Sequence, residues 1–139
     1  MKILSWNVNG IRAVGQKGFF DWLSKANPDV LALQETKAHS HQLDDSYLAP
    51  LGFQTYWHSA KKPGYSSVAF YTRHSPIEVH EGIGIEEIDD EGRFIQADFG
   101  NLSIISIYLP SGSSGEHRQA AKFFSMEKRY GKKLAKDID

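Results

Sequence analysis

The six-residue segment VLALQE, residues 30–35, decides how this chain folds. Its nearly continuous apolar run has the length of a β-strand, and such a run is typical of a strand covered on both faces. Before it, KGFFDWLSKANPD (17–29) carries apolar residues at helical spacing, and this helix is expected to end at Asn27-Pro28. Further upstream, KILSW (2–6) has the pattern of a first strand. Strand, helix and strand in this order predict the opening unit of an α/β layer.

Downstream of this unit, the sequence predicts one more helix over 42–50 and then a series of short strands. The expected strands are FQTYWH (53–58), SVAFYTR (67–73), IEVHEG (77–82), FIQADFG (94–100) and LSIISIYL (102–109). Gly100-Asn101, between two alternating apolar runs, indicates a hairpin. From Ser114 onward a stripe at helical spacing predicts a final helix, and its apolar members are Ala120, Phe123, Phe124, Tyr130, Leu134 and Ile138.

Length and composition limit the classes of protein to which the chain can belong. A length of 139 residues predicts one domain with a core, spanning 1–139. The chain has no cysteine, which excludes a disulfide framework and a thiolate zinc site, and we expect it in the cytoplasm of a bacterial cell. The N-terminus lacks a long apolar stretch, so we expect neither a signal peptide nor contact with a membrane.

The overall charge does not favour binding to a polyanion. Sixteen Lys and Arg residues against seventeen Asp and Glu residues give a net charge of −1. Any binding to nucleic acid must therefore come from local patches. The segment EKRYGKKLAK (127–136) is one basic cluster, and it is either such a patch or a solvated helix face.

Polar residues follow the two predicted strands at the point where each strand ends. Asn7 and Asn9 come at the end of the first strand, and Glu35 ends VLALQE. Because parallel strands finish at one edge of a sheet, the three side chains are expected to meet where α/β proteins usually bind ligands. Carboxylate and amide oxygens suit Mg²⁺. Alternatively, the Asn residues shape a turn and Glu35 pairs with Lys37.

Two further segments have the residue types of a phosphate site. Tyr108 closes a strand and precedes LPSGSSG (109–115), a loop whose backbone N–H groups can bind phosphate. Alternatively, Tyr108 is a core aromatic residue, and a flexible turn with a Ser N-cap follows it. Tyr65 and Ser66, in PGYSS (63–67), can contact a phosphate backbone or simply belong to a hairpin loop. The six histidines do not have the spacing of a zinc motif and are expected mostly at the surface.

Five motifs together resemble the exonuclease III/apurinic endonuclease family. They are SWNVNGIRA (5–13), PDVLALQETK (28–37), KKPGYSSVAFYTR (61–73), EGRFIQADFGNLSIISIYLPSG (91–112) and AAKFF (120–124). Their order and spacing match along essentially the whole chain. NGIRA together with LQETK distinguishes this family from the branches that resemble pancreatic DNase I, inositol-phosphate phosphatases and sphingomyelinases.

The resemblance implies the N-terminal part of a four-layer α/β sandwich of the DNase I type, with mostly antiparallel or mixed sheets and flanking helices. It also implies a DNA-repair nuclease that uses Mg²⁺, or Mn²⁺ as a substitute, and acts on duplex DNA at abasic sites and 3′ ends. The implied catalytic residues are Asn7, Glu35 and Tyr108, the implied DNA-binding residues are Arg12, Lys37, Tyr65 and Ser66, and the implied metal ligands are Glu35 and Asn9, the latter standing where many relatives have Asp.

The sequence departs from the family pattern after the predicted final helix. The later Asp-x-Asn segment, a more distal Asp and a C-terminal Ser-Asp-His segment are not among the 139 residues. Loss of a general base commonly costs about 10²–10⁴ in rate, so we expect weak or no nuclease activity from this incomplete domain alone. We also expect self-association or pairing with a complementary C-terminal half. The alternative function is a non-catalytic DNA-binding or assembly fragment.

Overall fold

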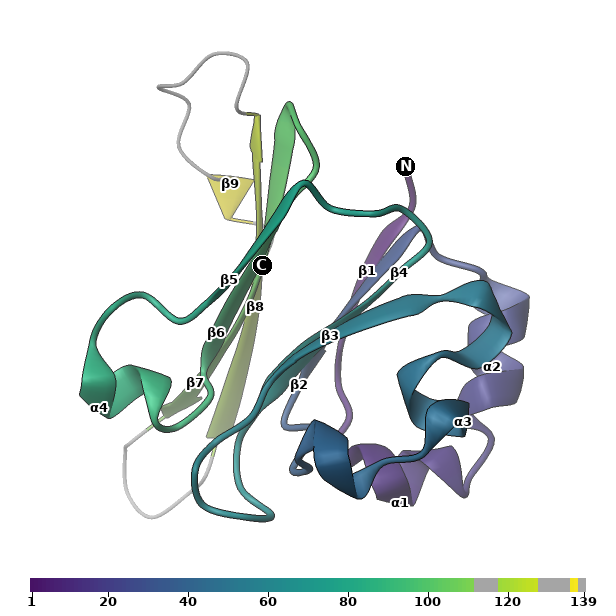
Figure 1. Cartoon of the computed structure of the whole chain (residues 1–139), viewed down its shortest axis with the longest axis horizontal. Coiled ribbons are helices and arrows are strands. Elements are labelled where there is room, and N and C mark those ends of the chain that lie inside the picture. Colours follow the sequence, from purple (N-terminus) through teal and green to yellow (C-terminus); the bar gives the residue numbers. More distant parts are fainter. Residues whose placement is uncertain (112–117, 128–135, 138–139) are drawn as a thin grey trace.

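The computed structural model describes residues 1–111, 118–127 and 136–137, and it shows two facing β-sheets (Figure 1). The first sheet has the order β1-β2-β4-β3, and its strands are β1 (Ile3–Asn7), β2 (Val30–Gln34), β3 (Gln54–His58) and β4 (Val68–Thr72). β1 pairs with β2 in parallel, whereas β4 is antiparallel to both of its neighbours. The four strands predicted in this part of the sequence are confirmed.

The second sheet is antiparallel throughout and has the order β5-β6-β7-β8-β9. Its strands are β5 (Glu78–Glu81), β6 (Phe94–Asp98), β7 (Leu102–Ser111), β8 (Arg118–Glu127) and β9 (Lys136–Asp137). Between β6 and β7, Gly100 has a φ of 98°, which glycine adopts without a steric penalty. The Phe99 N–H donates to the Leu102 carbonyl at 2.7 Å. The predicted hairpin is confirmed.

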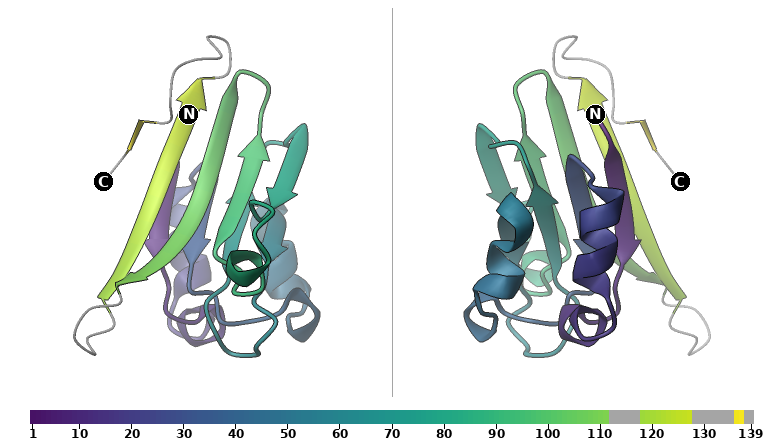
Figure 2. Two further views of the ribbon diagram at one scale, coloured as in Figure 1. Left: turned by 90° about the vertical axis from the view of Figure 1, so that its left-hand side faces the viewer. Right: turned by 90° about the vertical axis from the view of Figure 1, so that its right-hand side faces the viewer.

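Helices cover the outer face of the first sheet (Figure 2). They are α1 (Ile11–Gly15), α2 (Phe19–Ala26) and α3 (Asp45–Leu48), with short 3₁₀ turns at η1 (Ser40–Gln42) and η2 (Pro50–Gly52). α2 ends as predicted, because Asn27 takes a left-handed φ of 44°. The helix expected over 42–50 is shorter than predicted. A fourth short helix, α4 (Glu86–Asp89), lies on the far side of the second sheet (Figure 2).

β2 contributes to two hydrophobic cores at once. Leu31 and Leu33 pack in the core beneath the helices, whereas Val30 and Ala32 pack between the two sheets. Alternate residues of a strand point to opposite faces of the sheet, so a strand can contribute to both cores only if both of its faces are apolar. Each fully buried leucine contributes about 1.5–3 kcal/mol to stability. The predicted strand covered on both faces is confirmed. No helix in the described part of the chain is long and apolar enough to cross a membrane.

The helix expected from Ser114 onward is wrong for residues 118–127, which form β8. β8 pairs with β7 from Leu102 opposite Glu127 to Ser111 opposite Arg118. This pairing satisfies the backbone groups along one edge of β7, and such tertiary pairing overrides a local helical spacing. Residues 109–111 of the predicted loop LPSGSSG belong to β7 instead, because they pair with β8. Residues 112–117 and the rest of the predicted helix and basic cluster, at 128–135 and 138–139, lie outside the described residues.

Candidate active site

The turns that follow β1 and β2 run side by side at one end of the first sheet. The Gly10 N–H donates to the Glu35 carbonyl at 2.7 Å, and the Ile11 N–H donates to the Thr36 carbonyl at 2.9 Å. These bonds continue the parallel pairing beyond the ends of the strands. The structure therefore brings Asn7 and Glu35 to the same sheet edge, as their positions in the sequence predict.

Five predicted site residues form one polar network at this edge, which we call the Glu35 network: Asn7, Asn9, Arg12, Glu35 and Lys37. The Lys37 Nζ donates to Asn9 Oδ1 at 2.6 Å and lies 3.8 Å from Glu35 Oε2. The Asn9 N–H donates to Asn7 Oδ1 at 3.1 Å, and the Arg12 guanidinium donates to the Lys37 carbonyl at 3.3 Å. Glu35 is only 6% exposed, so its carboxylate is held largely out of water.

Backbone strain is concentrated around the Glu35 network. A left-handed φ costs a non-glycine residue about 1–3 kcal/mol and is common at functional sites. Within the described residues, most non-glycine positions of this kind lie here: Asn9 (φ 48°), Glu35 (52°), Lys37 (54°), Ser66 (46°) and Ser67 (78°). The loop before β4 is attached to the turn after β2, since the Thr36 and Lys37 N–H groups donate to the Ser67 and Ser66 carbonyls at 3.1 and 3.0 Å.

Two hydroxyl groups in the same place are buried and have no hydrogen-bond partner among the residues that the structure describes: Thr36 Oγ1 and Ser66 Oγ. Both residues are 1% exposed. A buried polar atom of this kind costs about 1–3 kcal/mol, so an unsatisfied pair beside strained backbone is typical of a ligand site and not of a structural core. Ser66 lies too deep to contact DNA unless its loop opens, and its DNA-binding role stays a prediction.

Tyr65 and Tyr108 belong to a second polar group, which we call the Arg93 group: Tyr65, Glu91, Arg93 and Tyr108. The Tyr65 hydroxyl donates to Glu91 Oε1 at 2.9 Å, and the Arg93 guanidinium donates to both Glu91 oxygens at 2.8 and 3.0 Å. The guanidinium carbon of Arg93 lies 5.8 Å from the centre of the Tyr108 ring, and Tyr108 is 4% exposed.

Gly92, which lies between Glu91 and Arg93 in the sequence, closely approaches the segment at the end of β3. A Cβ atom at this position would lie 2.5 Å from the Ala60 nitrogen and 2.8 Å from the His58 carbonyl oxygen, and the φ of Gly92 is 59°. Only glycine fits both the space and the backbone conformation. This close approach positions Glu91 and Arg93 against the rest of the molecule.

Charges within the Arg93 group shift the pKa values of its members. The hydrogen bonds from Arg93 lower the pKa of Glu91, while the hydrogen bond to Glu91 and burial raise the pKa of Tyr65. For Arg93, burial acts to lower the pKa, but the hydrogen bonds and negative charge of Glu91 outweigh it and raise the pKa. The group therefore keeps a carboxylate, a guanidinium and a neutral phenol near pH 7.

A buried bridge connects the two sheets just behind these groups. Gln34 Nε2 donates to Ser106 Oγ at 3.0 Å, and Ser106 Oγ donates to the Leu33 carbonyl at 3.0 Å. Glu35 directly follows Gln34, and Tyr108 lies two residues after Ser106. The ends of β1, β2 and β7 accordingly lie at the same lower end of the sandwich (Figure 1).

Sequence reasoning did not identify Thr36, Glu91, Arg93 or the Gln34–Ser106 bridge. Glu91 and Arg93 belong to EGR, immediately before a predicted strand. The available signal for their pairing was an acidic residue two positions before a basic one. Nothing in the sequence marks the hydroxyl of Thr36 as unpaired, because its surroundings depend on the loop before β4.

The fold and this site define an α/β sandwich protein whose candidate site lies where strands of both sheets end. A family model described as "Endonuclease/Exonuclease/phosphatase family" matches residues 4–136. Because this match covers nearly the whole chain, the chain belongs to that family.

Two curated relatives represent the branch of the family that the sequence motifs resemble. The chain is 42% identical over 119 residues to an exodeoxyribonuclease of Bacillus subtilis (strain 168), covering 85% of this chain and 46% of the relative. It is 44% identical over 117 residues to the DNA repair nuclease APEX1 of Danio rerio, covering 83% of this chain and 38% of the relative. The resemblance inferred from the motifs is confirmed.

Two solved structures are similar to this fold. An AP endonuclease from Archaeoglobus fulgidus superposes with a TM-score of 0.68 at 29% identity, over 79% of this chain and 41% of the other. A 3′ phosphatase from Neisseria, solved with a product DNA hairpin, gives a TM-score of 0.70 at 30% identity, over 83% of this chain and 45% of the other. The expected fold class is confirmed. The chain spans less than half the length of each of these relatives.

Proposed function

We propose that the chain forms one side of the active site of a DNA-repair nuclease that resembles exonuclease III, hydrolysing phosphodiester bonds at abasic sites and 3′ ends. The observation that supports this proposal most directly is the buried carboxylate of Glu35, which lies beside Asn7 among strained loops. Strain, burial and unsatisfied hydroxyls at one strand end are typical of a functional site. The names of the relatives supply the reaction class.

Glu35 is the proposed ligand for Mg²⁺, with Mn²⁺ as a substitute. A carboxylate that is 6% exposed, with its nearest cation 3.8 Å away, fits a hard divalent ion that takes few protein oxygens. A bound ion supplies charge stabilisation for the phosphate and the leaving oxygen. Asn7 holds the turn through its bond from the Asn9 N–H. A metal role for Asn9 requires its amide oxygen to release Lys37, and this role stays a prediction.

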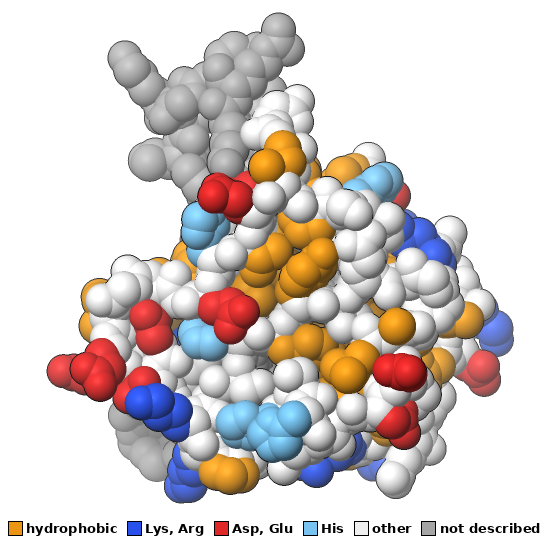
Figure 3. Space-filling model, in the orientation of Figure 1, with side chains coloured by type: hydrophobic (Ala, Val, Ile, Leu, Met, Phe, Trp, Pro, Cys, Tyr) orange, Lys and Arg blue, Asp and Glu red, His pale blue; other side chains and the backbone are white. Residues whose placement is uncertain are grey.

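DNA is the proposed substrate, and the contacts are local because the net charge is −1. Several Lys and Arg side chains lie along the lower edge of the molecule (Figure 3), the end at which β1, β2 and β7 finish. Arg12 and Lys37 would contact phosphates from one side of the site, and Tyr65 from the other. Contacts to phosphate position a duplex without reading its sequence. Tyr108 is the proposed contact to the scissile phosphate.

We expect the chain alone to have weak or no activity, because it matches less than half of each relative. The test uses a duplex with one abasic site, with Mg²⁺ and with a chelator. Little incision is expected from the chain alone, and chelator-sensitive incision is expected once the chain is joined to the C-terminal part of the Bacillus subtilis relative. Efficient incision by the chain alone would overturn the expected inactivity.

Glu35→Ala in the joined protein tests the proposed ligand. We expect incision to fall by about 10²–10⁴-fold, because the metal loses its buried carboxylate. Glu87→Ala, at an exposed acidic residue of α4, is the matched control and should leave incision unchanged. Equal incision by wild type and Glu35→Ala would show that Glu35 is not the ligand.

A second candidate is an assembly or DNA-binding fragment that requires a complementary chain. Within the described residues β1 pairs only with β2, and Leu4, Ser5, Trp6 and Trp22 line a hollow of about 340 Å³ beside it. An open strand edge next to an apolar hollow favours addition of another strand. Sedimentation of the chain by itself and with a complementary C-terminal half would distinguish pairing from self-association.

Location in the cytoplasm of a bacterial cell also stays a prediction.

A further inference from the structure

Three side chains that bind metals well meet on the outer face of the second sheet, away from the Glu35 network. Glu78 and His80 lie two residues apart on β5 and therefore share a face, and Asp98 lies opposite Glu78 on β6. The His80 Nε2 atom is 3.1 Å from Asp98 Oδ2 and 3.5 Å from Glu78 Oε2. One ligand atom from each residue lies within 4.8 Å of the other two.

Surrounding residues hold Asp98 in the orientation of a ligand. Asp98 is 3% exposed, and its Oδ1 accepts hydrogen bonds from Gln96 Nε2 at 2.8 Å and from Ser103 Oγ at 2.6 Å. Its second oxygen, Oδ2, is the one directed at His80. Carboxylates that bind metals are characteristically fixed in this way by donors outside the coordination sphere.

We propose that Glu78, His80 and Asp98 form a binding site for a divalent transition metal, with Zn²⁺ as the preferred ion. An imidazole nitrogen with two carboxylate oxygens suits Zn²⁺, whereas Mg²⁺ prefers oxygen ligands alone. Ligand atoms about 2.1 Å from a tetrahedral Zn²⁺ lie about 3.4 Å apart. The distances of 3.1 and 3.5 Å from His80 are close to that spacing before any movement.

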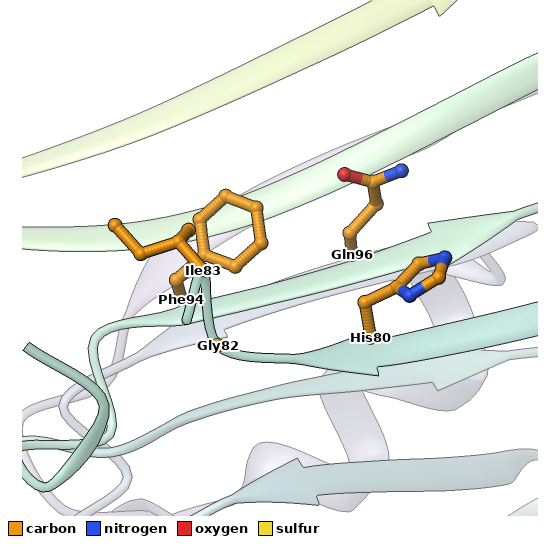
Figure 4. A pocket seen from close by; sticks show the side chains of 5 residues that line it. All are labelled: His80, Gly82, Ile83, Phe94 and Gln96. Atoms are coloured by element: carbon orange, nitrogen blue, oxygen red, sulfur yellow. The ribbon is translucent and has the colours of Figure 1, made fainter. Parts of the chain in front are cut away.

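The site has an open approach from solvent. A hollow of about 440 Å³, lined by His80, Gly82, Ile83, Phe94 and Gln96, adjoins the imidazole (Figure 4). Figure 4 shows His80 and Gln96 standing side by side at one end of the hollow, with Ile83 and Phe94 at the other. The hollow provides the entry path that a metal site requires and room for a water molecule as the fourth ligand.

Binding of Zn²⁺ would connect the edge strand β5 to β6 through side chains from both strands. An ion that binds only the folded chain raises stability in proportion to the logarithm of its concentration over Kd. The proposal does not depend on nuclease activity, because the cluster lies on a different sheet and face from Glu35.

Isothermal titration of the whole chain with zinc chloride tests the proposal. We expect one Zn²⁺ per chain, an affinity unaffected by excess Mg²⁺, and a midpoint of thermal unfolding that rises with Zn²⁺. His80→Gln and Glu78→Gln should each weaken binding by more than about tenfold, and Ser103→Ala, which removes one of the two donors to Asp98 Oδ1, by about tenfold. Glu78 and His80 are exposed, so both variants should fold, which circular dichroism would verify.

His74→Gln is the matched control. The His74 Nε2 atom lies 2.9 Å from Asp29 Oδ1. This histidine therefore pairs with one carboxylate, whereas His80 lies close to two. The His74→Gln variant should bind Zn²⁺ as wild type does. A variant that combines His39→Gln with His41→Gln is a second control, because these two histidine rings lie 5.1 Å apart and could bind Zn²⁺ together. Unchanged binding in His80→Gln, or loss of binding in either control instead, would overturn the proposal and leave His80 as an ordinary polar neighbour of two carboxylates.

Discussion

The Glu35 network and the Arg93 group lie at the same end of the molecule but are held in opposite ways. The first has left-handed non-glycine residues, a buried carboxylate 3.8 Å from its nearest ammonium, and two unpaired hydroxyls nearby. In the second, Arg93 donates to both oxygens of Glu91, and the Tyr65 hydroxyl donates to the same carboxylate. The backbone strain and the unpaired hydroxyls of the first region lower stability and agree with the ligand site proposed there, whereas the Arg93 group satisfies its own charges.

Ser106→Ala tests how much the buried bridge behind the two regions contributes to stability. It removes the hydroxyl that accepts from Gln34 Nε2 and donates to the Leu33 carbonyl, so buried polar groups lose their partners. We expect the free energy of unfolding to fall by about 2 kcal/mol in urea denaturation. Ser5→Ala, which removes a more exposed partner of Gln34, should cost clearly less. Similar losses in both variants would contradict a special role for the bridge.

Ser66→Gly and Ser67→Gly are a matched pair that measures the strain directly. Ser66 has a φ of 46° and a hydroxyl without a partner, so Ser66→Gly should stabilise the protein by about 0.5–1 kcal/mol. Ser67 has a φ of 78°, but its hydroxyl accepts from the Ala60 N–H and donates to the Tyr65 carbonyl. Ser67→Gly should therefore lose about 1 kcal/mol in thermal or urea unfolding. Destabilisation by Ser66→Gly would show that the loop is not strained.

The contribution of the Arg93 group to the pH dependence of stability is the smallest expected effect. The pKa of Glu91 is lowered in the folded state by Arg93, so its contribution is present above the unfolded pKa and is lost as pH falls through the folded pKa. The pKa of Tyr65 is raised, first by Glu91, so its contribution is present below the unfolded pKa and is lost as pH rises through the folded pKa. Glu91 is partly exposed, so the acid loss should be below about 1 kcal/mol.

Two variants separate these titrations in urea denaturation at a series of pH values. Glu91→Gln should reduce the acid-side loss, to which Asp29 and Asp44 also contribute because hydrogen bonds lower their pKa values. Tyr65→Phe should reduce the alkaline loss, to which Tyr71 also contributes because burial raises its pKa. If the pH profile of Glu91→Gln matches that of wild type, Glu91 is not one of the groups that titrate.

The sequence predicted those features that depend on periodicity and on the ends of strands. The apolar run at 30–35 correctly indicated a strand buried on both faces, and strand ends correctly placed Asn7 beside Glu35. It did not predict the unpaired hydroxyl of Thr36, because that depends on the backbone of the loop before β4. It also did not predict the meeting of His80 with Asp98, which antiparallel pairing across a loop of more than ten residues produces.

The helix predicted from Ser114 onward fails for a related reason. Its apolar spacing at 120–124 suits a helix, yet β8 pairs with β7 at these positions. The spacing of apolar residues describes one segment by itself, whereas a β-ladder forms only where a neighbouring strand can pair with the segment. Features that arise from contact between distant segments were therefore the ones that sequence reasoning missed.

Gly92 implies a limit on which sequences can keep this arrangement. Any side chain there would push the segment 58–60 away from Glu91 and Arg93, since a Cβ would approach backbone atoms to 2.5–2.8 Å. Gly64 also has a positive φ, of 70°, but nothing lies within 4 Å of its Cβ position. In a library that randomises both codons and selects for folded protein, position 92 should return glycine alone. Position 64 should also return Asn and Asp, which tolerate a left-handed backbone.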